Sequence, residues 1–416
     1  MICLLLCWAA MAAPGVEPTA LRVWHAKTGQ QVEAKAMDMT AGKVKLERAD
    51  GSKLQIEFEK LTMADQAVLR EHFAPAATPA ATPDTAGDAP SVAPSVAPSS
   101  VVDGAPADDL PYPLGTTTAA ISCGNEFHYF LYLPKSLRKG AKHPVIFVMS
   151  PDGGTAVDTD RYRAGAERNR WIIAVSQESK NGTEIWQQAV DSMIRHVTAT
   201  LPVNHKRMYA SGYSGGSRGA FITAQAHKDF AGVIACAAGG APGSARQVVY
   251  GLSGTNCFNR AEMAGCFKGF KNKDCVLRYF PGAHDWANEE LCDDAITHLN
   301  GVFLTENRTA YPDDCALYVQ QVMALIGECA TSAPLRAYMW SSFLTKHGVK
   351  DPKLEAIHAT LGQSDVNKLY VKGLTDIQQF AGKVFAAPKA SAACKKEAKK
   401  YAGTPWEDIL TRLGDA

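Results

Sequence analysis

The stretch Arg207-Met-Tyr-Ala-Ser-Gly-Tyr-Ser-Gly-Gly-Ser-Arg-Gly-Ala220 decides how the middle of this 416-residue chain is interpreted. A β-prone run, Met208 to Ala210, leads into Gly212-Tyr-Ser-Gly-Gly216, and a helical pattern follows from Phe221. G-x-S-x-G between a strand and a helix is typical of a nucleophile elbow, a tight turn that exposes a serine hydroxyl at the edge of a sheet. The pattern predicts Ser214 as a nucleophile, with glycines at the two positions where a Cβ would clash.

Strand and helix patterns alternate on both sides of this turn. Apolar runs without alternation, such as Pro144 to Met149, are typical of strands covered on both faces. Together the patterns predict an α/β fold with a mostly parallel sheet over residues 112–307. The expected strands are 127–133, 145–149, 172–176, 208–210, 233–237, 248–252 and 276–280, and the expected helices are 158–170, 183–201, 217–230, 258–270 and 288–304.

Residues 21–73 form a separate pattern of short alternating runs, which predicts half-buried strands. Turn signals punctuate them at Thr28-Gly29, Ala41-Gly42 and Asp50-Gly51, and a helix start follows at residues 61–66. The pattern resembles the SHD module, the first homology domain of Sla-type endocytic adaptors. The resemblance implies a small all-β, SH3-like barrel that tethers the protein or binds a protein or peptide partner.

The rest of the chain completes a multidomain arrangement. Residues 74–111 are rich in Pro, Ala and Ser and predict a disordered linker, because they carry too little apolar bulk to offset ordering entropy. Residues 308–416 predict a helical C-terminal region, with apolar periodicity around 317–326, 335–344 and 377–384. No motif in that region indicates chemistry.

The first residues predict export. Residues 2–13 are apolar and end in the small-x-small pattern Ala10-Met-Ala12, so we interpret residues 1–13 as a signal peptide and expect a periplasmic or extracellular protein. Nine cysteines after this segment fit an oxidising compartment. No later run reaches the ~18 apolar residues that a spanning helix needs. With 43 basic and 42 acidic residues, the charge favours no nucleic-acid partner, and the cysteines lack the C-x-x-C pairing of a zinc site.

Residues 116–300 resemble the α/β-hydrolase superfamily, and most of all its secreted polyhydroxybutyrate-depolymerase and feruloyl-esterase branch. Three segments carry the resemblance: Pro202 to Gly216, Asp229 to Ala235, and Tyr279-Phe-Pro-Gly-Ala-His-Asp-Trp286 with its G-x-H-x-W loop. The resemblance implies a serine hydrolase for carboxylic esters that needs no cofactor or metal.

Three histidines follow Ser214 in this region: His227, His284 and His298. His227 falls at the end of the helix after the elbow, and His298 falls inside a helical pattern. His284 comes directly after the last expected strand, at the edge of the sheet where the serine lies. It is therefore the expected general base.

The oxyanion hole is expected to combine the backbone N–H of Gly215 with one from Ser150-Pro-Asp-Gly-Gly154, the loop after an earlier strand. Because Pro151 has no N–H, the second donor must be Asp152 or Gly153.

The third member of a triad is missing from its usual place. The loop Ser253 to Arg260 has no acid, and the resemblance puts the expected aspartate on Cys257. Asp274 precedes the last strand and is expected at the opposite end of the sheet. The candidates for orienting the imidazole are Asn256, Cys257, Asn259 and Asp285, the last of which we interpret as loop structure. Cys257 could alternatively form a disulfide with Cys292 or Cys266.

Two hypotheses follow. The first is a secreted serine esterase that cleaves a polyester, a plant-wall ester or a short-chain acyl ester through an acyl-enzyme on Ser214. The second is a catalytically silent, hydrolase-like binding or adaptor protein, tethered by its N-terminal barrel. The missing acid favours the second, and the intact elbow favours the first.

Overall fold

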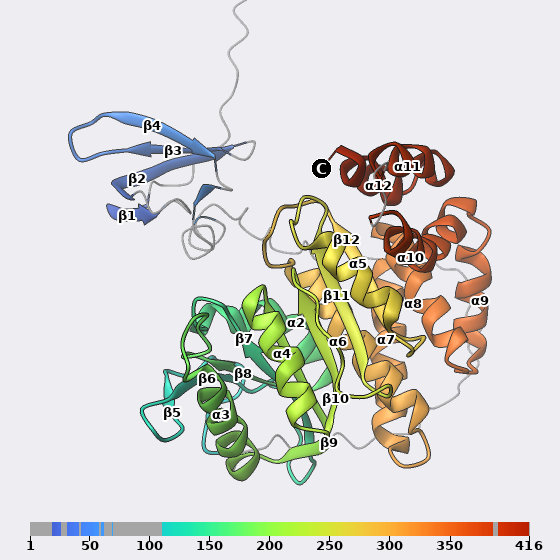
Figure 1. Cartoon of the computed structure of the whole chain (residues 1–416), viewed down its shortest axis with the longest axis horizontal. Helices are drawn as coiled ribbons and strands as arrows, with labels where there is room; N and C mark the ends of the chain where they lie inside the picture. The colour runs from blue at the N-terminus through green and yellow to red at the C-terminus, as the bar shows by residue number, and fades with distance from the viewer. Residues whose placement is uncertain are drawn as a thin grey trace, which may run out of the picture. The chain divides into compact units, whose positions relative to one another are not determined.

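The computed structural model describes residues 19–25, 31–40, 43–57, 60–61, 69, 110–385 and 390–415. The chain divides into two compact units, Met1–Ser99 and Ser100–Ala416, which are described separately (Figure 1). The predictions of a signal peptide at 1–13, a helix start at 61–66 and a linker at 74–111 lie almost wholly outside the described residues.

The first unit contains a small antiparallel sheet. Its strands are β1 (Arg22–His25), β2 (Gln31–Thr40), β3 (Lys43–Glu47) and β4 (Lys53–Glu57), paired in chain order. Alternate side chains face inward, as the sequence predicts: Trp24, Ala34, Ala36, Val44 and Leu46 are fully buried. The hairpin between β3 and β4 turns at Gly51, whose φ of +79° suits glycine. An SH3-like closure of these strands stays a prediction.

The second unit is built on an eight-stranded sheet of order β12-β11-β10-β9-β7-β8-β6-β5. Pairing is parallel from β12 to β8, while β6 pairs antiparallel with β8 and β5 with β6, which confirms the predicted mostly parallel sheet. The strands are β5 (Ile121–Ser122), β6 (His128–Tyr132), β7 (His143–Met149), β8 (Ile172–Ser176), β9 (Val203–Tyr213), β10 (Phe230–Cys236), β11 (Val248–Gly254) and β12 (Val276–Phe280).

Helices cover both faces of this sheet (Figure 1). A short 3-10 turn, η2 (Ala156–Thr159), leads into α2 (Asp160–Asn169), which packs with α6 (Glu289–Glu306) over one buried cluster. The other face is covered by α3 (Trp186–Thr200), α4 (Gly215–Ala226) and α5 (Arg260–Gly269). All five helices were expected from the sequence and differ from it only at their ends.

The C-terminal region is helical, as predicted. It comprises α7 (Pro312–Ser332), α8 (Pro334–Lys346), α9 (Pro352–Leu361), α10 (Asp365–Val384), α11 (Ala390–Ala398), η3 (Lys399–Tyr401) and α12 (Pro405–Asp415). Buried side chains of these helices, including Trp340 and Ile377, belong to the same apolar cluster as the α3–α5 face of the sheet. Within the described ranges, no helix combines the length and apolar character needed to span a membrane.

One of these helices covers an edge of the sheet. The side chain of Gln378, on α10, accepts the N–H of Leu277 on β12 at 2.8 Å and donates to the carbonyl of Cys275 at 3.4 Å. The carboxamide thus takes the place of a further strand. An uncovered edge would offer unpaired backbone groups to other chains, so this contact protects β12.

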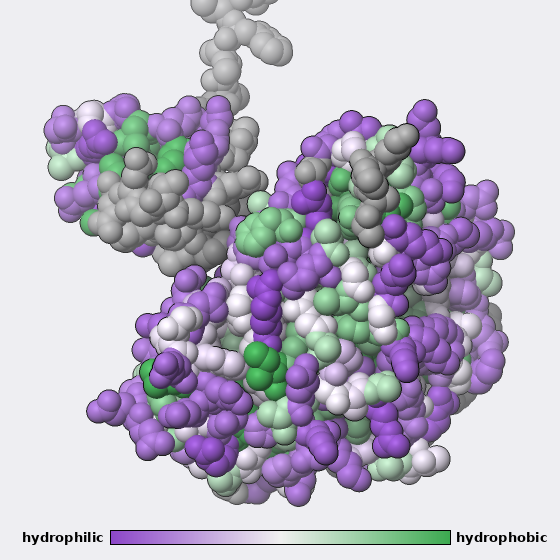
Figure 2. Space-filling model, viewed as in Figure 1, coloured by the Kyte–Doolittle hydropathy of each residue, from purple (hydrophilic) through white to green (hydrophobic). Residues whose placement is uncertain are grey.

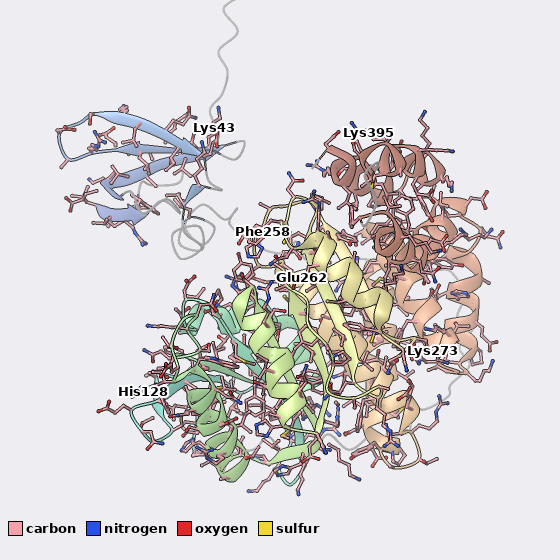
Figure 3. All side chains as sticks on the ribbon, viewed as in Figure 1. Lys43, His128, Phe258, Glu262, Lys273 and Lys395 are labelled. Atoms are coloured by element: carbon pink, nitrogen blue, oxygen red, sulfur yellow. The ribbon has the colours of Figure 1, made fainter. Side chains whose placement is uncertain are left out.

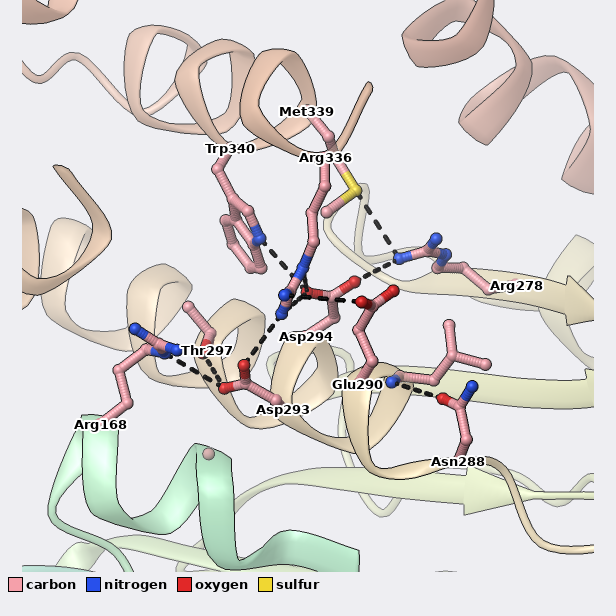
Figure 4. Close-up of polar contacts among 12 residues, drawn as sticks. Arg168, Arg278, Asn288, Glu290, Asp293, Asp294, Thr297, Arg336, Met339 and Trp340 are labelled. Atoms are coloured by element: carbon pink, nitrogen blue, oxygen red, sulfur yellow. Dashed lines mark hydrogen bonds and ion pairs between the residues drawn. The ribbon is translucent and has the colours of Figure 1, made fainter. Parts of the chain in front are cut away.

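A buried ionic network joins the C-terminal helices to the sheet (Figure 4). Asp294, on α6, is 1% exposed and contacts Arg278 of β12 at 2.8 Å and Arg336 of α8 at 2.8 Å. It also accepts the indole N–H of Trp340 at 3.2 Å. Asp293 beside it binds Arg336 and Arg168. Since removing one partner of a buried ion pair strands the other charge, this network fixes α8 against the sheet.

Candidate active site

Ser214 lies at the turn between β9 and α4, with φ 52° and ψ −119°. This left-handed φ is unusual for a residue with a side chain, and such strain clusters at functional sites. A Cβ on Gly212 would overlap the backbone of Gly216, and one on Gly216 would overlap the carbonyl of Met149. Gly212 is therefore required by the tightness of the turn and Gly216 by the close approach of the end of β7, at the two positions that the sequence indicated.

The structure brings Ser214 and His284 together. Ser214 Oγ and His284 Nε2 lie 2.8 Å apart, although 70 residues separate them in the sequence. His284 follows β12, and the hydroxyl of Tyr213 donates to its backbone carbonyl at 2.7 Å. The hydrogen bond is short enough for the imidazole to take the serine proton.

Cys257 lies on the other side of the imidazole. Its Sγ is 3.1 Å from His284 Nδ1, and its side chain is fully buried in the loop after β11. The disulfide alternative is wrong, because Cys257, Cys266 and Cys292 are all free thiols. A thiol therefore stands where a triad carboxylate would contact the imidazole.

The surroundings of this sulfur suit a hydrogen-bond acceptor. Burial raises the pKa of the Cys257 thiol, while hydrogen bonds from the Asn259 N–H and the Ser253 side chain act in the opposite direction. The net effect keeps the thiol protonated at neutral pH. Sγ lies 3.8 Å from the carbonyl of Ala237, which can accept the S–H. In this assignment Nδ1–H of His284 donates to the sulfur, and Nε2 remains an acceptor for Ser214.

The other candidates for an orienting group do not contact the imidazole. Asn256 is exposed, and its N–H donates to Gly282. The Asn259 carboxamide donates to the carbonyl of Ala237 at 2.9 Å. The carboxylate of Asp285 accepts the N–H of Trp286 at 3.0 Å, in keeping with a loop role.

The remaining polar candidates also lie where the sequence suggested. His227 ends α4 and contacts Asp191 at 3.0 Å, and His298 is buried within α6, where its Nε2 contacts the carbonyl of Asp274 at 2.7 Å. Within the described residues, no group of three or more His, Cys, Asp and Glu side chains could hold a metal ion.

The environment of His284 favours a neutral imidazole. Partial burial lowers its pKa below the ordinary value, the charge of Arg218 lowers it further, and Asp285 acts against both. A neutral imidazole is the form that can accept the serine proton at neutral pH.

Phe258 is a site residue that the sequence analysis missed. Its ring stacks on His284 with 3.9 Å between centroids and 25° between planes, yet its side chain is 71% exposed. Figure 3 shows Phe258 and Glu262 at one end of the sheet and Lys273 at the other. Phe258 adjoins Cys257 in a loop of the sequence without acids, and nothing local to it signals a ring contact 26 residues away.

The backbone N–H groups expected in the oxyanion hole differ in whether they already have an acceptor within the protein. Gly215 is the first residue of α4, so its N–H has no acceptor within the helix. The N–H of Gly153 donates to Ser150 at 3.1 Å and closes the turn after β7. No hydrogen bond from the N–H of Asp152 is found in the part of the chain that the structure describes. Gly215 and Asp152 are thus the available pair.

A pocket of about 440 Å³ opens beside the elbow. Apolar atoms of Met149, Trp186 and Ile222 line one part of it, and polar groups from the 179–183 loop line the rest. Elsewhere on the visible face, hydrophilic side chains dominate and hydrophobic ones form small separate patches (Figure 2). The pocket reaches Gly215, the residue after Ser214, and could hold part of a substrate.

The strand order, the strained Ser214 between β9 and α4, and His284 after the last strand together define an α/β-hydrolase fold in the second unit. In the first unit, residues 13–74 match the family model of SLA1 homology domain 1. No curated protein matches the chain.

Solved structures resemble part of this chain at low identity. The S-formylglutathione hydrolase FrmB of Staphylococcus aureus is 12% identical with a TM-score of 0.37, over 46% of this chain and 99% of that one. Est1E of Butyrivibrio proteoclasticus is 12% identical with a TM-score of 0.36, over 43% and 96%. A ferulic acid esterase is 15% identical with a TM-score of 0.35, over 44% and 95%.

Proposed function

We propose that this protein is a serine hydrolase for carboxylic esters, with Ser214 as nucleophile, His284 as general base and Cys257 orienting the imidazole. The contact of 2.8 Å between Ser214 Oγ and His284 Nε2 carries the proposal. The strained turn supports it, because it positions the Ser214 hydroxyl for attack. The α4 N-terminus also supports it, because its N–H groups stabilise the negative charge that results.

Each step follows from the positions of these groups. Ser214 Oγ forms a bond to the ester carbonyl carbon while its proton moves to His284 Nε2. The oxyanion is held by the N–H groups of Gly215 and Asp152. The alcohol leaves with the proton from His284, and water activated by His284 then releases the acid from Ser214. A neutral thiol stabilises the imidazolium less than a carboxylate would, so activated esters are better substrates than amides.

Labelling with a fluorophosphonate probe tests the proposal. The full-length protein is expected to be labelled on Ser214, and Ser214→Ala is expected to abolish the label. His284→Ala should reduce labelling by about 10³-fold or more, because the base is lost. Unchanged labelling in Ser214→Ala would overturn the assignment. Turnover of p-nitrophenyl esters by the same three proteins gives an independent measure.

One observation favours a second function. Where a triad acid would contact the imidazole, the protein has a buried, protonated thiol. A hydrolase fold without activity, used for binding, would tolerate this replacement. The two functions separate when wild-type turnover of p-nitrophenyl acetate is compared with that of Ser214→Ala, because equal rates support the silent protein.

We also propose roles for the first unit and the leader. The match of residues 13–74 supports a module that binds a protein or peptide partner or tethers the hydrolase. The apolar run at residues 2–13 supports export to the periplasm or the exterior, where polymeric esters such as polyesters or plant-wall esters would be accessible. Fractionation of cells that express the full chain tests the location.

A further inference from the structure

We infer that the pocket beside the elbow binds the acyl part of the ester, and that it selects acyl groups that end in a carboxylate through Lys180. This inference rests on the proposed esterase function and names a substrate class for that site.

The position of the pocket assigns it to the acyl group. Ser214 follows β9, and in the sheet β10, β11 and β12 lie to one side of β9, with β7 and β8 to the other. His284 follows β12, whereas the pocket is formed by Met149 at the end of β7, the 179–183 loop after β8, and the starts of α3 and α4. The leaving alcohol must lie next to the imidazole that protonates it. The acyl group therefore extends away from His284, into the pocket.

The walls suit a carbon chain or ring near the scissile bond. Met149, Trp186 and Ile222 supply apolar surface. Gly216 and Gly219, which have no side chains, leave room on the side of the pocket formed by α4. A Cβ on Gly219 would come within 3.3 Å of the Trp186 ring, so the helix and this indole already pack closely. The volume of about 440 Å³ exceeds the space that a formyl or acetyl group would fill.

The charged groups in the lining are cationic. Lys180 and Arg218 are both among the lining residues, and no carboxylate is among the described residues that line the pocket. The charge of Arg218 is compensated by Glu262, with which it forms an ion pair at 2.7 Å. Lys180 makes no ion pair within the described part of the chain, and the carbon atoms of its side chain pack against Gly153. Its ammonium group is therefore the charge available to a ligand.

Gly153 makes this course of the lysine side chain possible. A Cβ at that position would lie 2.7 Å from Lys180 Cε, and Gly153 has a φ of +85°, which suits glycine. The loop that carries Lys180 is tied to the oxyanion loop, because the Asn181 N–H donates to the carbonyl of Pro151 at 2.8 Å. Lys180 thus lines the pocket from a loop that is tied to the Ser150–Gly154 turn.

A pair of matched esters tests the inference. p-Nitrophenyl hydrogen glutarate carries a terminal carboxylate, and p-nitrophenyl valerate has the same chain length without charge. We expect wild-type kcat/KM to be about tenfold higher for the glutarate half-ester at low ionic strength, since one near-surface charge pair supplies an effect of this order. The preference should fall in 0.5 M NaCl, because salt screens exposed charges. Rates of Ser214→Ala are subtracted, which removes the self-catalysed hydrolysis of the half-ester.

Two variants locate the effect. Lys180→Met keeps much of the stem and removes the charge, so it should bring the ratio of the two kcat/KM values close to one. Lys228→Met is the matched control, since Lys228 is an exposed lysine in the turn before β10, at the opposite end of the sheet. It should leave the ratio unchanged.

The outcomes separate the two proposals. Equal hydrolysis of both esters by wild type, or an unchanged ratio in Lys180→Met, overturns the acyl-pocket inference while the esterase stands. Failure of wild type to hydrolyse either ester faster than Ser214→Ala overturns the esterase function itself.

Discussion

Cys257 and His284 meet 3.1 Å apart, sulfur to Nδ1, at the position where a serine hydrolase needs an acceptor for the imidazole. The sulfur is fully buried, and the donor groups of Asn259 and Ser253 lower the pKa of the thiol against the effect of burial. Hydrogen-bond donors that converge on one buried atom would also stabilise a carboxylate there.

Replacing this thiol by an acid should therefore increase activity. Cys257→Asp is expected to raise kcat for p-nitrophenyl acetate by about tenfold or more, because an orienting aspartate contributes up to ~10⁴ in serine proteases. Cys257→Ala, which removes the acceptor, should lower kcat. Equal kcat values in wild type, Cys257→Ala and Cys257→Asp would show that the sulfur has no positioning role, provided that thermal melting shows all three to be folded.

The pH dependence of activity should report the state of His284. Its pKa is lowered by partial burial and by Arg218, so kcat/KM should rise with pH along a limb centred below the ordinary histidine value of about 6.5. In Cys257→Asp the new carboxylate favours the imidazolium, and the limb should move to higher pH. An identical limb in both proteins, measured between pH 4 and 9, contradicts this assignment of the base.

Stability should depend on the buried carboxylate of Asp294. Asp294→Asn leaves the guanidinium of Arg278 buried without its acid, so the free energy of unfolding should fall by about 3 kcal/mol or more. Urea denaturation followed by circular dichroism measures this change. The matched control is Asp408→Asn in the exposed Asp408–Arg412 pair of α12, which should unfold at nearly the wild-type urea concentration. A similar loss in both variants would mean that burial of the network is unimportant.

Acidification should destabilise the second unit through His298. Burial lowers the pKa of this histidine to about 4, so between pH 6.5 and 4 the unfolded chain binds a proton that the folded protein does not. Stability from this group is present above the unfolded pKa and is lost as the pH falls, by about 2 kcal/mol from pH 7 to pH 5.

His298→Gln isolates that contribution. Asp274, whose pKa is lowered by Lys346 against the effect of burial, also loses stabilising charge on acidification, so the variant should keep part of the pH dependence. The difference between wild type and His298→Gln should shrink as the pH falls. A constant difference from pH 7 to pH 5 would show that His298 does not titrate on unfolding.

Local sequence determined the elbow. Gly212, Ser214 and Gly216 lie within five consecutive residues, so the sequence pattern alone indicated the turn. The backbone that excludes a Cβ on Gly216, however, belongs to Met149 and Ser150 at the end of β7. The alternation of apolar strands and amphipathic helices fixed the α/β architecture, because hydrophobic periodicity is a property of short windows. The position of His284 followed from its place after the last strand of that architecture.

Only the tertiary structure decided which of the four candidates contacts the imidazole and completes the site. Cys257 contacts His284 because parallel pairing of β11 and β12 brings the loops after both strands to one edge, and no short window contains both residues. Lys180 reaches the pocket through the neighbouring β8 loop, and Gln378 covers β12 from about 100 residues away in the chain. Contacts of this kind depend on the packing of distant segments, which sequence spacing does not encode.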